Sequence, residues 1–279
     1  MNRPTVSVII PALNEAENLP YVLRDIPTEE VDEVILVDGH STDDTVAVAR
    51  AIMPDIRVIE QPGKGKGDAL RAGFEAATGD IVVAIDADGS TDPREIPVFV
   101  GALLAGADYV KGSRFLQGGG TADMPLYRQQ GNWGLTMLVR LLFGGKYTDL
   151  CYGYNAFWRR VLPLLALDAD GFEIETLMNI RALRAGLKVA EVPSFEAPRI
   201  HGEGRLRAFP DGWRVLKTIL RERFCPTVDV RRVDRVFGKR ERALLAQACE
   251  AAADPGTTLA ESRASSPLKP AAPVTRPAA

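Results

Sequence analysis

Residues Ile81 to Asp92 read IVVAIDADGSTD, and this stretch predicts the fold of the chain. Its first five residues are apolar or small, and the run stops at Asp86, Ala87 and Asp88 before Gly89. An apolar run that ends at a turn is typical of a central parallel strand. Because open α/β sheets bind ligands beyond the carboxyl ends of their strands, we expect both carboxylates at the mouth of a site.

The two carboxylates predict a divalent-metal site. Hard cations such as Mg²⁺ and Mn²⁺ take oxygen ligands and usually share them with substrate phosphates. An Asp-x-Asp pair alone also occurs in many acidic turns. Here the pair follows a buried strand and precedes a helix start at Asp92-Pro93, and this position favours a metal site that serves a nucleoside diphosphate.

Strands and helices alternate along the first part of the chain. The strands are expected at residues 5–11, 34–37, 56–59 and 81–85, and a helical pattern follows each of them. Such alternation requires a parallel sheet with right-handed crossovers. We therefore predict an α/β protein whose Rossmann-like, mostly parallel sheet is flanked by helices.

Polar motifs follow the strands of this part of the chain. Asn14 and Glu15 come after the first strand, Asp38 and Ser41 after the second, and Lys66 lies in a glycine-rich loop after the third. Acidic side chains at strand ends suit a base and a ribose hydroxyl. The loop lacks the spacing of a phosphate-binding P-loop, so Lys66 is interpreted either as a phosphate or base contact or as part of a solvated loop.

These motifs resemble those of a known family. The nucleotide-sugar motifs of family 2 glycosyltransferases with the GT-A fold are similar to residues 11–15 (PALNE), 37–43 (VDGHSTD), 65–69 (GKGDA) and 86–88 (DAD). The polyprenyl-phosphate sugar synthase branch is similar to residues 112–115 (GSRF), 149–158 (DLCYGYNAFW), 172–175 (FEIE) and 186–193 (GLKVAEVP). The resemblance spans about residues 4 to 222.

The resemblance implies a single GT-A catalytic domain over residues 1–224, with a nucleotide-sugar half (1–111) and an acceptor half (112–224). It implies a UDP- or GDP-linked sugar as donor and Mg²⁺ or Mn²⁺, held by Asp86 and Asp88, as cofactor. The loop that carries His201 and Arg205 would face the leaving diphosphate, although His201 also fits a surface histidine. The expected donor contacts are Pro11, Asn14, Glu15, Asp38, Ser41, Lys66, Asp86, Ala87, Asp88, His201 and Arg205.

The resemblance makes Arg114 a contact for an acceptor phosphate and Arg128 a second candidate. A guanidinium matches phosphate oxygens, although a structural salt bridge is the alternative for Arg114. Glu173 or Glu175 would act as general base towards a hydroxyl acceptor, whereas a phosphate acceptor needs none. The expected catalytic set is Asp88, Arg114, Arg128 and Glu173. The glycine-rich residues 117–123 are expected to form a mobile loop over the donor.

Several departures from the branch concern the site. Asp38 is followed by Gly39 instead of a second acid, and Ser90 stands where a metal-binding Gln is often found. The usual Ser-Gly-Phe-Arg is replaced by residues 152–155 (YGYN), and Asn132 occupies the place of an expected Ser. The last two changes bear on the identity of the acceptor.

The predicted reaction is therefore an inverting, metal-dependent transfer of a sugar from a nucleoside-diphosphate sugar, with a polyprenyl phosphate as the expected acceptor. One alternative keeps the chemistry but uses a soluble metabolite or natural-product intermediate. A nucleotidyltransferase would favour a glycine-rich basic loop after the first strand, and residues 11–15 lack one. A non-catalytic sensor of sugar nucleotides is the third alternative.

Composition indicates an ordinary globular protein: 46% of the 279 residues are hydrophobic and 25% are charged, and the net charge is −3. Acidic residues outnumber basic ones 19 to 8 up to Glu95, whereas basic residues outnumber acidic ones 13 to 6 from Arg199 to Arg242. The basic region suggests an anionic partner, either a phosphate-bearing substrate or a membrane surface, and we expect no nucleic acid.

The expected location is the cytoplasm, with peripheral contact at the inner membrane face. Three unpaired cysteines fit a reducing compartment, and neither a signal peptide nor a spanning segment is evident. Residues 213–224 place Trp213, Ile219 and Phe224 on one helical face and basic residues on the other, which is typical either of an interfacial helix or of a helix packed on its own domain. Residues 225–253 are expected to form a basic helical extension and residues 254–279 a disordered tail.

Overall fold

The computed structural model describes residues 3–122 and 124–226. Its main sheet has seven strands in the order β3-β2-β1-β4-β7-β5-β8. The strands are β1 (Val6–Ala12), β2 (Glu33–Asp38), β3 (Arg57–Glu60), β4 (Ile81–Ala84), β5 (Tyr109–Ser113), β7 (Asn155–Trp158) and β8 (Val189–Pro193). The expected extension over residues 225–253 lies almost wholly outside the described residues, and the expected tail lies entirely outside them.

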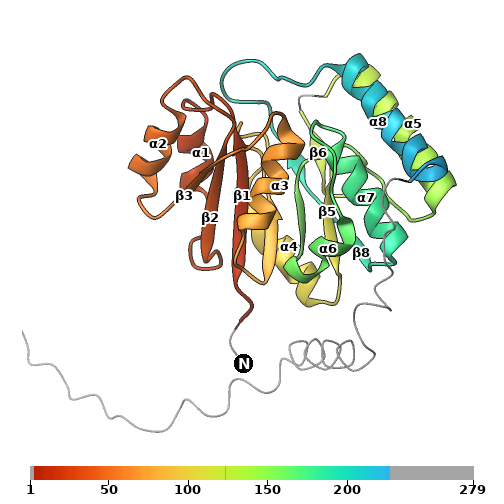
Figure 1. Cartoon of the computed structure of the whole chain (residues 1–279), viewed down its shortest axis with the longest axis horizontal. Coiled ribbons are helices and arrows are strands. Elements are labelled where there is room, and N and C mark those ends of the chain that lie inside the picture. The colour runs from red at the N-terminus through yellow and green to blue at the C-terminus, as the bar shows by residue number, and fades with distance from the viewer. Residues whose placement is uncertain (1–2, 123, 227–279) are drawn as a thin grey trace, which may run out of the picture.

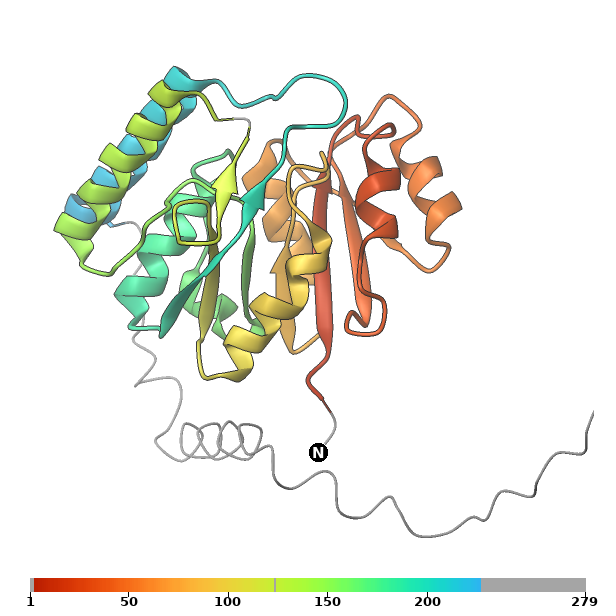
Figure 2. The same ribbon diagram turned by 180° about the vertical axis from the view of Figure 1, so that it is seen from behind.

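Helices cover both faces of this sheet, as Figures 1 and 2 show. One face carries α1 (Leu19–Arg24), α2 (Thr45–Ile52) and α4 (Ile96–Leu104), and the other carries α3 (Lys66–Ala76), α6 (Leu162–Leu165) and α7 (Ile174–Ala185). Short 3-10 turns at Pro93–Glu95 and Arg159–Val161 precede α4 and α6. The predicted α/β class with a mostly parallel sheet is confirmed.

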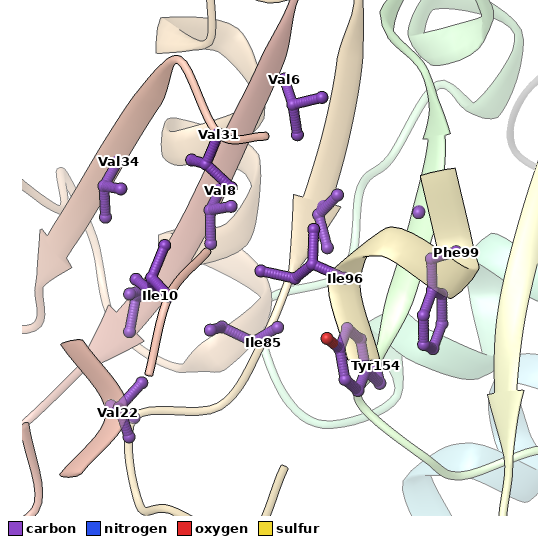
Figure 3. Packing of buried hydrophobic residues seen from close by; sticks show 14 of the residues in the cluster. Val6, Val8, Ile10, Val22, Val31, Val34, Ile85, Ile96, Phe99 and Tyr154 are labelled. Atoms are coloured by element: carbon purple, nitrogen blue, oxygen red, sulfur yellow. The ribbon is translucent and has the colours of Figure 1, made fainter. Parts of the chain in front are cut away.

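Alternation along the strands divides the core into two layers. Val6, Val8 and Ile10 of β1 face the α1, α2 and α4 side, whereas Ile9 faces the α3 side. Figure 3 shows the first layer, in which Phe99 of α4 stacks on Tyr154 with ring centroids 4.0 Å apart. The central strands are buried on both faces, which explains the continuous apolar run of β4.

Strand β7 was not anticipated from the sequence. It pairs antiparallel with β4 on one side and with β5 on the other, so it separates two strands that are closer in sequence. Its first residue, Asn155, therefore lies beside the last residue of β4, Ala84, at the carboxyl edge of the parallel strands. The segment before β7 is thereby brought to the site that Asp86 and Asp88 occupy.

The predicted glycine-rich loop contains a short strand. Residues Gly120–Thr121 form β6, which pairs in parallel with β9 (Phe195–Glu196), and Asp123 lies outside the described residues. The backbone of residues 120–122 bonds to the segment after β8, and movement of this loop over the donor stays a prediction.

A pair of long helices, α5 (Leu126–Phe143) and α8 (Ala208–Phe224), lies side by side at the end of the molecule opposite β3 (Figures 1 and 2). They pack on each other and on α7 through a third apolar cluster that includes Val139, Ile180, Val215 and Ile219. This packing buries Ile219 but leaves Trp213 and Phe224 exposed, so the predicted helical face is split between the domain and the surface.

Candidate active site

The loops after β1 and β2 are joined at one edge of the sheet. Asn14 adopts a positive φ of 54°, and its backbone amide donates to the Ser41 hydroxyl over 2.9 Å. The Asn14 side chain in turn accepts from the Thr42 amide over 2.7 Å, and the Ser41 amide donates to Asp38. Four of the predicted donor residues, with Glu15 directly beside Asn14, therefore lie in one cluster at the carboxyl ends of β1 and β2.

Asp86 is held by a buried ammonium. The Nζ atom of Lys66, at the first residue of α3, lies 2.6 Å from Asp86 Oδ1 and 2.7 Å from Oε1 of Glu175 in α7. Burial disfavours the charged ammonium, but the two carboxylates outweigh it and raise the pKa of Lys66 above its ordinary value. Burial raises the pKa of Asp86 to about 6, while Lys66 opposes that rise.

Asp88 has different partners. It accepts hydrogen bonds from the Ser90 amide and hydroxyl over 3.0 and 2.7 Å, and an Arg199 nitrogen lies 3.2 Å from its other oxygen. Arg199 also pairs with Glu15, which accepts from Asn18 over 2.6 Å. Although burial lowers the pKa of Arg199, these carboxylates raise it overall. Through its contacts with Glu15 and Asp88, the guanidinium links the segments that follow β1 and β4.

Asp86 and Asp88 suit a hard cation. Their carboxylates and the Ser90 hydroxyl supply only oxygen donors, which is what Mg²⁺ and Mn²⁺ prefer. Among residues 3–122 and 124–226 no three His, Cys, Asp or Glu side chains gather as a complete metal cage. Such a donor set fits an ion that takes its remaining ligands from a substrate diphosphate.

The loop after β9 brings two further predicted residues to this edge. Arg205 donates to the backbone oxygen of Leu13 over 2.7 Å. The backbone of His201 exchanges hydrogen bonds with Asn18, but its ring lies against Tyr21, with centroids 5.8 Å apart. The structure therefore places His201 near the site through its backbone, with its ring against an aromatic neighbour.

Two more expected donor contacts lie in the backbone of this edge. Pro11 is the last but one residue of β1, and Ala87 is buried between the two aspartates. Their side chains carry no polar atom, so any donor contact would involve the backbone or apolar surface.

Arg114 lies at the end of β5 in a buried ion pair. Its side chain is 2% exposed, its Nε atom lies 2.7 Å from Asp149, and another nitrogen lies 3.0 Å from Glu196. The guanidinium also stacks over the Tyr152 ring at 4.8 Å. Burial disfavours its charge, yet the carboxylates raise the pKa of Arg114 above its ordinary value. The arrangement fits the salt-bridge interpretation, and contact with an acceptor phosphate stays a prediction.

The remaining candidates lie in the acceptor half. Arg128 is in the first turn of α5 and is half-buried. One oxygen of Glu173 accepts from the Gly171 amide over 3.2 Å, and the other is buried without a hydrogen-bond partner in the described part of the chain. Glu175 is also buried, and its Oε1 atom is bound to Lys66.

An apolar groove of about 450 Å³ lies beside α5. Its walls come from α5 and from the segments beside Arg114 and Asp149. The lining residues are Phe115, Gln129, Gln130, Trp133, Thr136, Met137, Arg140, Tyr147 and Thr148.

The sequence did not single out Arg199 or Asn18 individually, nor the contact between Glu175 and Lys66. The charged partners of these contacts lie 109 to 184 residues apart in the chain. The basic composition of residues 199–205 was the one sequence signal for Arg199, and it indicated the whole segment without singling out this arginine.

A mostly parallel sheet with helices on both faces is the architecture of the GT-A class of glycosyltransferases, and solved members of that class share this fold. The sequence matches the family model described as glycosyl transferase family 2 over residues 7–164, more than half of the chain. The protein belongs to this family and is a glycosyltransferase.

Two curated relatives illustrate the similarity. The undecaprenyl-phosphate mannosyltransferase of Micrococcus luteus is 33% identical over 214 residues, which cover 72% of this chain and 87% of the relative. The polyprenol monophosphomannose synthase of Mycolicibacterium smegmatis is 35% identical over 206 residues, which cover 68% of this chain and 77% of the relative.

A solved structure shares the fold. Glucosyl-3-phosphoglycerate synthase from Mycobacterium tuberculosis, in complex with Mn²⁺, UDP and glucosyl-3-phosphoglycerate, is 30% identical and superimposes with a TM-score of 0.63. The match covers 80% of this chain and 81% of the synthase. The similarity therefore extends to an enzyme crystallised with a divalent metal and a nucleoside diphosphate.

Proposed function

We propose that this protein transfers a sugar from a UDP- or GDP-linked donor to a polyprenyl phosphate at a membrane surface, with inversion at the anomeric carbon. The donor part is supported by Asp86 and Asp88 at the sheet edge and by the Mn²⁺ and UDP bound to the related synthase. The acceptor part is supported by the names of the two mannosyltransferase relatives.

The observation that carries the acceptor proposal is the apolar outer surface of α5 and α8. Large hydrophobic side chains point to solvent along both helices, and arginines and a lysine are interspersed on α8. Aromatic and basic side chains together favour a membrane interface. The exposed hydrophobic residues are Leu126, Tyr127, Trp133 and Leu141 on α5, and Phe209, Trp213, Leu220 and Phe224 on α8.

The apolar groove beside α5 suits the isoprenoid part of such an acceptor. Trp133 and Met137 line it from α5, and Arg128 lies in the first turn of the same helix. A lipid lying in this groove would bring its phosphate to the acceptor half of the site. Among the residues that the structure describes, no helix has the length and apolarity needed to cross a bilayer.

The residues of the chain would divide the work as follows. Asp88 and Asp86 would hold a Mg²⁺ or Mn²⁺, which supplies Lewis-acid stabilisation to the departing diphosphate. Arg199 and Arg205, on the loop after β9, carry positive charge to the same edge. The acceptor phosphate oxygen is already ionised near neutral pH, so it attacks without a general base, and Arg128 would orient it.

A soluble phosphorylated acceptor is the second candidate. It is favoured by the likeness to glucosyl-3-phosphoglycerate synthase and by the replacement of the usual acceptor motif with Tyr152, Gly153, Tyr154 and Asn155. In that case Glu173, which keeps an unbound oxygen, would be the general base towards a hydroxyl group.

The test begins with the donor. The thermal stability of the protein is measured with UDP, GDP and common sugar nucleotides, with and without Mn²⁺, because a ligand that binds the native state raises the melting temperature. The selected sugar nucleotide, radiolabelled, is then incubated with undecaprenyl phosphate in detergent or with 3-phosphoglycerate.

We expect label in the organic phase, in a product labile to mild acid. Label in the aqueous product with 3-phosphoglycerate alone would establish the soluble acceptor instead. Stabilisation by a nucleotide without any transfer or slow hydrolysis would favour a sensor.

A further inference from the structure

Three charged side chains contact one another in a row, and one of them is Asp86 of the Asp-x-Asp motif. Asp86 and Glu175 each lie within 2.7 Å of Lys66 Nζ, and they reach it from opposite halves of the protein. The exposed fractions of the side chains are 24% for Asp86, 14% for Lys66 and 7% for Glu175. The lysine is therefore almost enclosed, and exposure increases towards the metal carboxylates.

The enclosure extends to the backbone. A Cβ atom added to Gly153 would lie 2.6 Å from Asp86 Oδ2, 2.9 Å from Lys66 Nζ and 3.0 Å from Glu175 Oε1. All three distances are at or below the shortest that real Cβ atoms make, so a side chain at this position would require at least one of the three charged groups to shift. The Phe172 ring lies on another side, with its centroid 5.8 Å from the ammonium. The position of Lys66 is thus fixed by α3, α7 and the segment before β7.

Glu175 is almost fully buried. It lies in the buried face of α7, and Oε1 is bound to Lys66. A lysine side chain has several rotatable bonds, and holding it against a single carboxylate costs conformational entropy. A second carboxylate on a packed helix restricts that freedom, so the contact with Lys66 is the route by which Glu175 can orient a side chain of the donor site.

We propose that Glu175 is a positioning residue of the donor site, which fixes the Lys66 ammonium against Asp86 and thereby sets the orientation of the Asp86 carboxylate. Gly153 leaves room for these three groups, because an added Cβ atom would displace at least one of them. This inference rests on the donor part of the proposed function and is independent of the acceptor.

The test is donor binding by the full chain, measured by titration calorimetry with Mn²⁺ and either UDP-glucose or GDP-mannose, whichever stabilises the wild type. Glu175→Gln keeps the shape of the side chain but removes its charge, and we expect about tenfold weaker binding. Gly153→Ala should weaken binding at least as much. The KM for the acceptor should stay unchanged.

Glu222→Gln is the matched control. Glu222 is also a fully buried glutamate, and it pairs with Arg181 and Arg184 between α7 and α8, away from the sheet edge. This variant should lower the melting temperature and leave the donor Kd unchanged. A general response to the loss of a buried charge would instead weaken donor binding in both glutamine variants, and that result would overturn the inference.

A double-mutant cycle separates positioning from direct action. If Glu175 acts through Lys66, then Glu175→Gln should cause no further loss of donor affinity in a Lys66→Met background. Additive losses, or wild-type binding by folded Glu175→Gln, would overturn the positioning role. Failure of the wild type to bind any sugar nucleotide would overturn the proposed function itself, so the two failures are distinguishable.

Discussion

The two aspartates of the Asp-x-Asp motif differ in the mobility expected of their partners. Asp86 is bound by Lys66 from the first turn of a packed helix, whereas Asp88 is bound by Ser90 and by Arg199 from a loop. A metal ion can therefore displace the Arg199 guanidinium from Asp88 more easily than it can displace the Lys66 ammonium from Asp86. We infer that Asp88 is the principal metal ligand and that Asp86 has the more constrained role.

Replacing Asp88 tests this assignment. Asp88→Asn should abolish the Mn²⁺-dependent part of stabilisation by the donor nucleotide and reduce turnover at least about a hundredfold, because a neutral amide binds a hard cation poorly. Thermal shift with and without Mn²⁺ measures the first effect. Asp92→Asn, which removes an acid that caps the following 3-10 turn, should keep the metal-dependent shift. An unchanged shift in Asp88→Asn would remove the metal role.

The pair of Arg114 and Asp149 predicts a pH-dependent stability. Burial opposes the charge of Asp149, but Arg114 and its hydrogen bonds lower the pKa of Asp149 below the ordinary 3.8. A carboxyl group whose pKa is lowered by folding stabilises the protein above its unfolded-state pKa, and this stabilisation is lost as the pH falls through the lower folded-state value. Its contribution is thus complete at neutral pH and disappears in strong acid.

Asp149→Asn should therefore cost about 3–5 kcal/mol of unfolding free energy at pH 7, since it leaves Arg114 buried without this charged partner. The difference from wild type should shrink as the pH falls below about 3.8. Urea unfolding at pH 7 and near pH 3 measures both values. Asp25→Asn at the surface should change stability by no more than about 0.5 kcal/mol at either pH. A pH-independent difference would contradict the linkage.

At the scale of elements, α5 and α8 present an apolar outer face while their inner faces are fixed to α7. The fixation uses charge as well as packing, because Glu222 of α8 is bound by Arg181 and Arg184 of α7. Because these ion pairs and the apolar packing fix the orientation of the two helices, their outer aromatic side chains stay exposed to solvent. The surface is therefore suited to a stable external contact.

Removing two exposed tryptophans should weaken that contact. Trp133→Ser combined with Trp213→Ser takes one aromatic side chain from each helix, and we expect at least about tenfold weaker binding to vesicles of anionic lipid. Sedimentation of the full chain with such vesicles measures the loss. Tyr21→Ser, an exposed aromatic on α1, is the matched control and should bind like wild type. Equal binding by the double variant would exclude this face as the contact.

The sequence predicted elements best where one local signal was sufficient. The strands β1 to β4 and the cap of α7 at Gly186, whose φ is 74°, follow from apolar runs, turns and a left-handed glycine. Strand β7 was missed because its four residues show no clear alternation, and its place between β4 and β5 depends on partners 44 to 77 residues away. Neither partner is visible in a short window of sequence.

Single residues of the site could be predicted only in part. The carboxylates at strand ends needed no tertiary information, since strand ends converge at one edge of a parallel sheet. The partners of Arg114 are Asp149 and Glu196, and its burial depends on both. The split face of α8 was missed because Glu222 appears polar in a helical projection, whereas its charge is neutralised inside the protein by arginines of α7.

At the scale of the whole molecule, the nucleotide-sugar half and the acceptor half share one sheet. Residues 155–158 of the acceptor half form β7, which joins β4 to β5 of the other half. The Lys66 and Glu175 contact and the Arg199 and Glu15 pair also cross between the halves. The two halves therefore name regions of sequence that contribute to a single cooperative structure.

A fragment of residues 1–150 tests this cooperativity. It retains β1 to β6 but lacks the strand between β4 and β5, so two central strands would each expose an unpaired edge. We expect the fragment to aggregate, whereas the full chain elutes as a folded species. Size exclusion and circular dichroism measure the difference. A soluble fragment with native-like, cooperative unfolding would contradict the shared sheet.

The position of β7 also has a consequence for synthesis of the protein. As the chain leaves the ribosome, β4 emerges more than 70 residues before the strand that completes its pairing. During that interval an apolar strand edge stays open to other nascent chains, which is the condition under which chaperones are needed. Synthesis of this enzyme should therefore depend on holding its first half apart from neighbours until residues 155–158 have been made.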